Sequence, residues 1–68
     1  MDKEYLERLI ARGDRAPFLT NERGEVCWIY MVGHNTCVGE PVIGWMNSDE
    51  GKAMFRESVR AYGRRMGY

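Results

Sequence analysis

Cysteine, histidine and proline are scarce in this sequence, and long apolar runs are absent from it. Two cysteines, one histidine and two prolines occur in 68 residues. No apolar run approaches the roughly 18–20 residues that span a bilayer, so we expect no membrane segment. The first ten residues, MDKEYLERLI, are charged and amphipathic, unlike the apolar core of a secretory signal. We therefore expect a cytoplasmic protein in which Cys27 and Cys37 stay reduced.

The chain is also short, and its length excludes several classes of protein. We expect 68 residues to form a single small domain over residues 1–68, because neither a repeat nor a linker divides them. There is no room for a separate cofactor domain, so we expect neither an enzyme nor a cofactor. A chain of this size buries only roughly 60% of the surface it exposes when unfolded. A partner or self-association would therefore help to stabilise it.

Net charge is missing as well, but the balance hides an asymmetry. Ten basic and ten acidic residues give a formal charge of zero. Residues 1–50 hold five basic and nine acidic residues, a net −4, whereas residues 51–68 hold five basic and one acidic residue, a net +4. Eight of the ten basic residues are arginine, which suits bidentate contacts with carboxylate or phosphate. Arginine enrichment also follows from GC-rich coding, so it does not by itself indicate a ligand.

The first half of the sequence predicts an amphipathic helix followed by a β-hairpin. Residues 3–12 predict the helix, since their apolar side chains share one stripe; Asp2 suits its N-cap and Gly13 its left-handed end. Residues 18–20 and 25–32 predict two strands around the polar turn at residues 21–24. Pro17 at the start of the first strand favours an edge position.

The strand predicted at residues 25–32 has apolar side chains on both of its faces. One face carries Val26, Trp28, Tyr30 and Val32, and the other carries Cys27, Ile29 and Met31. Such a strand is central in its sheet, or it covers its second face with a partner.

A third strand and a second helix complete the predicted fold. Residues 33–36 predict a turn, and residues 37–46 predict an irregular or bulged edge strand because Gly39, Pro41 and Gly44 interrupt it; its end at residues 42–45 is expected to pair best. Asn47 or Ser48 caps a helix over about residues 49–65, whose expected core stripe is Phe55, Val59, Tyr62 and Met66 with Met54 and Ala61 alongside. The fold class is therefore α+β, with an N-terminal helix, a two- to three-stranded antiparallel β-meander and a C-terminal helix packed on the sheet.

Two arrangements of thiol and imidazole deserve comparison with known chemistry. Cys27, His34 and Cys37 are ligand types that zinc prefers, but a structural site needs four ligands, and Glu40 would have to be the fourth. A Cys37–His34 dyad would need an orienting acid and an oxyanion donor, neither of which the sequence identifies. We expect no metal site and no catalytic residue, and interpret these residues as two reduced strand thiols and an exposed turn histidine.

The last helix carries a basic stripe, formed by Lys52, Arg56, Arg60 and Arg64 with Arg65 and Tyr68 near it. Such a face can follow a phosphate backbone with salt-sensitive affinity. The alternative is a solvated face that acids of the first helix partly neutralise. A nucleic-acid binder is typically net basic, and this chain is neutral.

The predicted sheet is rich in aromatic residues and methionine, namely Trp28, Tyr30, Met31, Trp45 and Met46. Tryptophan, tyrosine, methionine and arginine are enriched at protein interfaces. Two short helices cannot cover both faces of the sheet, so an exposed face would mark a partner surface or a homodimer surface. The alternative is that Trp28 and Trp45 belong to the core.

These observations favour a small non-enzymatic protein-binding module. We expect its partner-binding residues to be Trp28, Tyr30, Trp45, Arg56, Arg60 and Arg64, and its partner to be a larger protein or a second copy. The alternative function is nucleic-acid binding by the arginine stripe. In size and neutral charge the sequence resembles small phage and mobile-element proteins that inhibit or retune a larger host complex, such as anti-CRISPR and polymerase-binding phage proteins; the resemblance covers no specific motif.

Overall fold

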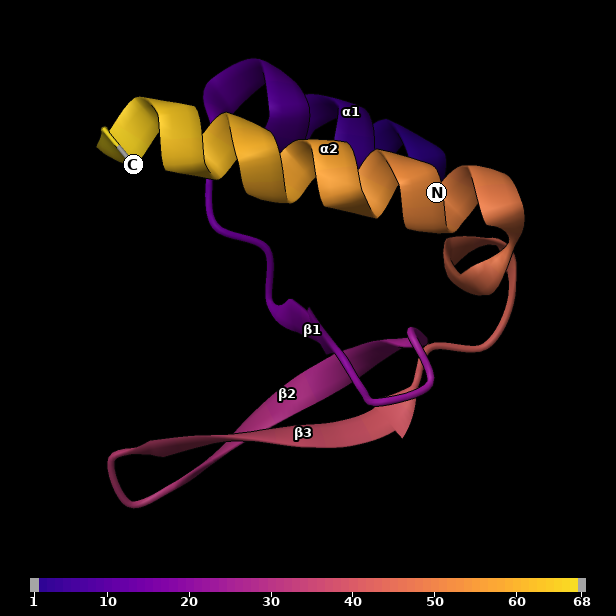
Figure 1. The fold of residues 1–68 in the computed structure, drawn as a ribbon, viewed down its shortest axis with the longest axis vertical. Coiled ribbons are helices and arrows are strands. Elements are labelled where there is room, and N and C mark those ends of the chain that lie inside the picture. Colours follow the sequence, from indigo (N-terminus) through magenta and orange to yellow (C-terminus); the bar gives the residue numbers. More distant parts are fainter. Residues whose placement is uncertain (1, 68) are drawn as a thin grey trace.

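Two helices lie side by side on one face of a three-stranded antiparallel sheet in the computed structural model, which describes residues 2–67 (Figure 1). The elements in chain order are α1 (Asp2–Arg12), β1 (Phe18–Thr20), β2 (Val26–Val32), β3 (Asn35–Pro41), the 3-10 helix η1 (Trp45–Asn47) and α2 (Asp49–Met66). This order and layering confirm the predicted α+β fold with the C-terminal helix packed on the sheet.

The two helices run parallel to each other. Near their N-terminal ends, Lys3 Nζ lies 3.1 Å from Glu50 Oε1. At their C-terminal ends, Gly13 follows α1 with a φ of +67°, and a Cβ placed on it would lie 3.0 Å from the Cβ of Arg65. Gly13 therefore ends α1 as predicted, and it also lets the chain pass close to α2. Asp2 is the first residue of α1, rather than the predicted cap before it.

The buried core joins both helices to the end of the sheet nearest η1. Its members are Leu6, Leu9, Phe18, Val26, Val42, Met46 and Phe55. The ring of Phe18 is central, because its centroid lies 6.3 Å from those of both Tyr5 and Phe55 in edge-to-face contacts. The core thus fixes β1 and the start of β2 beneath the helices.

The sheet has the order β1-β2-β3. Phe18 is opposite Trp28 and Leu19 is opposite Cys27, so Pro17 precedes an edge strand as predicted. Between β2 and β3 the register shifts at residues 27–29, which confirms the predicted bulge in the third strand. The turn between these strands is shorter than predicted, since Asn35 and Thr36 already pair with Val32 and Met31.

The third strand ends earlier than the sequence predicted. It stops at Pro41, and residues 45–47 form η1 instead of strand. Val42 still donates its N–H to Val26 O at 2.9 Å, but Gly44 has a φ of +110° and turns the chain. The side chain of Asn47 then takes over pairing with β2, because its Oδ1 accepts from Val26 N at 2.7 Å and its Nδ2 donates to Val26 O at 2.9 Å.

The buried face of α2 also differs from the predicted stripe. Phe55 and Ala61 are buried as expected, but Val59 and Met66 are 52% and 50% exposed. Ser58 is buried in their place, and its hydroxyl donates to Phe55 O at 2.7 Å. The helix is turned toward α1 as well as toward the sheet, so small residues occupy its inner side and Val59 is left at the margin.

Candidate protein interface

The β2–β3 hairpin extends away from the core. No residue from Trp28 to Pro41 is buried, and Figure 1 shows the two strands diverging from the helices toward their turn. Exposed side chains lie on both faces of this part of the sheet, and only Ile29, Cys37 and Gly39 are half-buried. A long two-stranded segment of this kind is marginally stable on its own.

The hairpin presents five large apolar side chains to solvent. Their exposed fractions are 52% for Trp28, 53% for Tyr30, 58% for Met31, 57% for Val32 and 41% for Val38. We call these five residues the hairpin surface. They are near neighbours on two paired strands, and exposed apolar residues gathered in one part of a small protein mark a contact site more often than isolated ones do.

The register divides the hairpin surface between the two faces of the sheet. Trp28 is opposite Phe18, whose ring lies in the core, so Trp28, Tyr30 and Val32 are on the helix side. Met31 and Val38 are on the outer side, the latter opposite Ile29. A partner can therefore contact apolar side chains on both faces of the hairpin.

One end of the hairpin surface is held firmly. The rings of Phe18 and Trp28 lie 4.9 Å apart at an angle of 54°. Gly39 fits closely beneath the next aromatic residue, since a Cβ placed on it would lie 3.1 Å from Trp28 O and 3.4 Å from Tyr30 Cδ1. Both aromatic side chains are thus supported by the sheet, which lowers the entropy lost when a partner covers them.

The other predicted partner-binding residues lie elsewhere. Trp45 is in η1, half-buried against the core, so one predicted tryptophan is exposed and the other serves the core. Arg56, Arg60 and Arg64 are exposed on α2. The structure brings Trp28 and Tyr30 together on β2, and it places the three arginines on a different surface.

The basic stripe is partly neutralised, but from within its own helix. Glu57 Oε2 lies 3.2 Å from Arg60 Nη1, and Glu57 Oε1 lies 3.1 Å from Arg64 Nη2. The hydrogen bond from Arg64, with the nearby charge of Arg60, lowers the pKa of Glu57 below the usual glutamate range. These exposed pairs persist above the ordinary glutamate pKa and are lost as the pH falls through the lowered value. Arg65 pairs with Asp14 at 2.9 Å, so the neutralising acids do not belong to the first helix.

Cys27, His34 and Cys37 do not converge. Cys27 is buried opposite Leu19, Cys37 is opposite Tyr30 on the other face of the sheet, and His34 is in the exposed hairpin turn. Both cysteines are free thiols. Within residues 2–67, groups of three or more histidine, cysteine or carboxylate side chains that could hold a metal ion are absent.

Sequence reasoning missed several exposed apolar residues, namely Val32, Val38, Ile43 and Val59. The sequence predicts Ile43 in a paired strand and Val59 in the helical core stripe, but their side chains are 94% and 52% exposed. Val32 and Val38 adjoin the predicted turn at residues 33–36, where a hairpin has little cover, and that position was the signal that could have identified them.

No helix in the described part of the chain is both long and apolar enough to cross a membrane. Comparisons of the chain with protein-family models, with curated proteins and with solved structures found no match.

Proposed function

We propose that this protein is a non-enzymatic protein-binding module, whose hairpin surface contacts a larger protein and occludes or retunes it. The observation that supports the proposal is the uncovered apolar hairpin from Trp28 to Pro41. The proposal places the protein in the cytoplasm, where the free thiols of Cys27 and Cys37 stay reduced. The small size and neutral charge of the chain resemble those of small phage or mobile-element regulators, which act on a host complex many times their size.

The composition of the hairpin surface favours a protein as the partner. Tryptophan, tyrosine and methionine are enriched in interface cores, whereas lysine and glutamate are depleted there. The five residues are all uncharged, so a nucleic-acid backbone would gain little from them. A protein surface with an apolar groove would bury both faces of the hairpin.

The test is retention of a protein from native cell extract, followed by binding of that purified protein. We expect Tyr30→Asp to abolish retention, because it places a charge in the centre of the hairpin surface. Ile43→Asp is the matched control, since Ile43 is the most exposed large apolar residue that the structure records and lies outside the hairpin. Circular dichroism must show that both variants are folded.

A fluorescence measurement makes the same test independent of extract. In a Trp45→Phe variant, Trp28 is the sole tryptophan, and its emission should shift to shorter wavelength when the purified partner is added. Equal retention by wild type and Tyr30→Asp, or an emission maximum of Trp28 typical of a buried indole in the free monomer, would contradict the proposal.

These experiments also test two alternatives to binding of a larger protein. A second copy of the chain would serve as the partner if the free protein were already dimeric. The exposure of Arg56, Arg60 and Arg64 supports nucleic-acid binding, although Glu57 pairs with two of them. This second function requires that Arg56→Ala with Arg60→Ala weakens binding of DNA or RNA and flattens its salt dependence; failure to bind either at low salt would remove it.

A further inference from the structure

The strand β1 has a free edge, and its hydrogen-bonding groups can be assigned. Asn21 donates its N–H to Glu25 O at 3.0 Å, and the β1–β2 register continues this pairing through Thr20–Val26, Leu19–Cys27 and Phe18–Trp28. Because hydrogen-bonded and non-hydrogen-bonded pairs alternate in antiparallel sheets, Leu19 bonds to Cys27. Phe18 and Thr20 therefore point their N–H and C=O groups outward, away from β2.

The backbone groups of Val26 confirm this alternation. Its N–H donates to Asn47 Oδ1 and its C=O accepts from Val42 N, so both groups point away from β1. The residue opposite it, Thr20, must then point its own groups to the free edge. An unpaired strand edge is a template for adding another strand.

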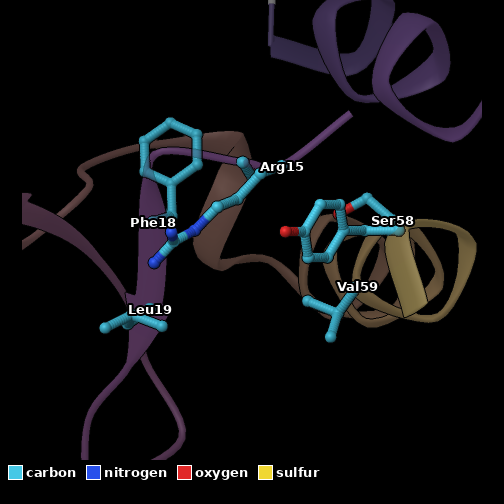
Figure 2. Close-up of a pocket in the computed structure, with 7 residues that line it drawn as sticks. Arg15, Phe18, Leu19, Ser58 and Val59 are labelled. Atoms are coloured by element: carbon cyan, nitrogen blue, oxygen red, sulfur yellow. The ribbon is translucent and has the colours of Figure 1, made fainter. Parts of the chain in front are cut away.

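A groove separates this free edge from α2. One cavity of about 190 Å³ lies between Phe18 and Leu19 on one side and Ser58, Val59 and Tyr62 on the other. Figure 2 shows Phe18 and Leu19 on β1 at one side of this cavity, Ser58 and Val59 on α2 at the other side, and the side chain of Arg15 extending toward β1. A second cavity continues past Thr20 toward Arg56 and Arg60, and Val59 lines both. The groove thus runs beside the strand and has an apolar wall.

The rim of the groove is basic. Arg15 lines the first cavity, and Arg56 and Arg60 line the second. Arg60 is paired with Glu57, whereas the ion pairs found within residues 2–67 leave Arg15 and Arg56 without a carboxylate. Acidic residues on a ligand would meet complementary charge at both ends.

We propose that this groove binds an extended acidic peptide segment of a partner protein, which adds to β1 as a fourth, antiparallel strand. Two peptide residues, opposite Phe18 and Thr20, exchange backbone hydrogen bonds with them. Their side chains point into the groove toward Val59, so they are apolar, and the residue between them lies beside Leu19. Acidic residues that flank this centre meet Arg15 and Arg56. This is strand addition to a sheet edge, with pockets for alternate side chains.

The groove shares no residue with the hairpin surface, so this inference does not depend on the proposed hairpin contact. The Tyr30→Asp variant should bind the peptide as wild type does. Loss of one binding event with retention of the other distinguishes the two proposals.

The probe is the capped peptide EDLTVDE. Its leucine and valine occupy the positions opposite Phe18 and Thr20, whose backbone N–H and C=O groups point away from β2. We expect a dissociation constant below about 1 mM at low salt, and weaker binding at high salt because the arginines are exposed. In amide hydrogen exchange followed by NMR, the amides of Phe18 and Thr20 should exchange fast in the free protein and slow when the peptide binds. The amide of Leu19, already bonded within the sheet, is the internal control.

Matched variants and peptides make the test specific. Val59→Gln should weaken binding about tenfold or more, whereas Met66→Gln, a change of the same kind at a similarly exposed residue of α2, should not. N-methylation of the leucine and valine amides removes the donors to β1 and should abolish binding. Equal binding of KKLTVKK, unchanged exchange at Phe18 and Thr20, or preferential binding of a short oligothymidylate at the same groove would overturn the proposal.

Discussion

At the scale of single residues, Gly51 is the place where the fold leaves least room. It lies in the first turn of α2, and a Cβ placed on it would overlap Trp45 O and lie 2.7 Å from Met46 O. Both obstacles are backbone atoms of η1, which cannot move aside as the end of a flexible side chain can. The first turn of α2 therefore packs directly on η1, where Ser48 Oγ accepts from Gly51 N at 3.1 Å.

We expect Gly51→Ala to destabilise the protein by about 1–3 kcal/mol, as overpacking does. Helix propensity alone predicts the opposite sign, a gain of up to about 1 kcal/mol. Ala53→Gly on the exposed side of the same helix is the control, and should cost about 1 kcal/mol by propensity. Urea denaturation measures the loss of stability expected for each variant; a more stable Gly51→Ala protein would show that η1 does not approach α2 as closely as described.

At the scale of elements, Asn47 joins the sheet to the helices. Its side chain makes three hydrogen bonds to backbone groups: it accepts from Val26 N at 2.7 Å, and it donates to Val26 O at 2.9 Å and to Val42 O at 2.7 Å. Val26 is fully buried, so water cannot replace these partners. The amide side chain of Asn47 thus provides backbone hydrogen bonds that a longer third strand would otherwise provide.

Asn47→Ala should therefore destabilise the protein by about 2–4 kcal/mol, since each buried group left without a partner costs roughly 1–3 kcal/mol. Asn47→Asp should be no better, because a carboxylate cannot donate to the two carbonyls. Asn35→Ala, in the exposed part of β3, should change stability by less than about 0.5 kcal/mol. Thermal unfolding provides the comparison, and similar melting temperatures for the two alanine variants would argue against the bridging role.

The sequence predicted the elements that local patterns specify, and failed where contacts between elements decide. The spacing of Leu6 and Leu9 and the turn at Asn21 are local signals, and both produced the expected helix and hairpin. Val42, Ile43 and Trp45 have strand-forming side chains, but the strand ends before them because Gly44 has a positive φ and Asn47 bonds to β2. Periodicity could not show which margin of α2 stays exposed, because that depends on where α1 lies.

The same distinction applies to the candidate interface. A strand with apolar side chains on both faces, in a chain with only two helices to cover it, predicted that aromatic residues of β2 stay exposed, and Trp28 and Tyr30 are so. The pairing of Glu57 with Arg60 and Arg64 could have been read from their separations of three and seven residues. The groove beside β1 could not be predicted, because it depends on the tilt of the helices over the sheet.

At the scale of the whole molecule, the core occupies only one part of the structure. Buried residues of the sheet are confined to Phe18, Val26 and Cys27, with Val42 just beyond β3, and the hairpin from Trp28 to Pro41 has none. Local stability follows buried contact, so such a segment should open more readily than the rest. A bound partner would supply the missing cover.

We therefore expect the hairpin amides of Tyr30 and Val32 to exchange hydrogen about 100-fold faster than the amide of Cys27, which bonds to β1 at the core end of the same strand. If the hairpin surface serves a heterologous protein, these rates should not change as the protein is concentrated, and should fall when that protein is added. NMR-detected exchange at several concentrations measures both. Protection of Tyr30 and Val32 that rises with concentration would assign the surface to a homodimer, and uniform protection along β2 would mean that the hairpin needs no cover at all.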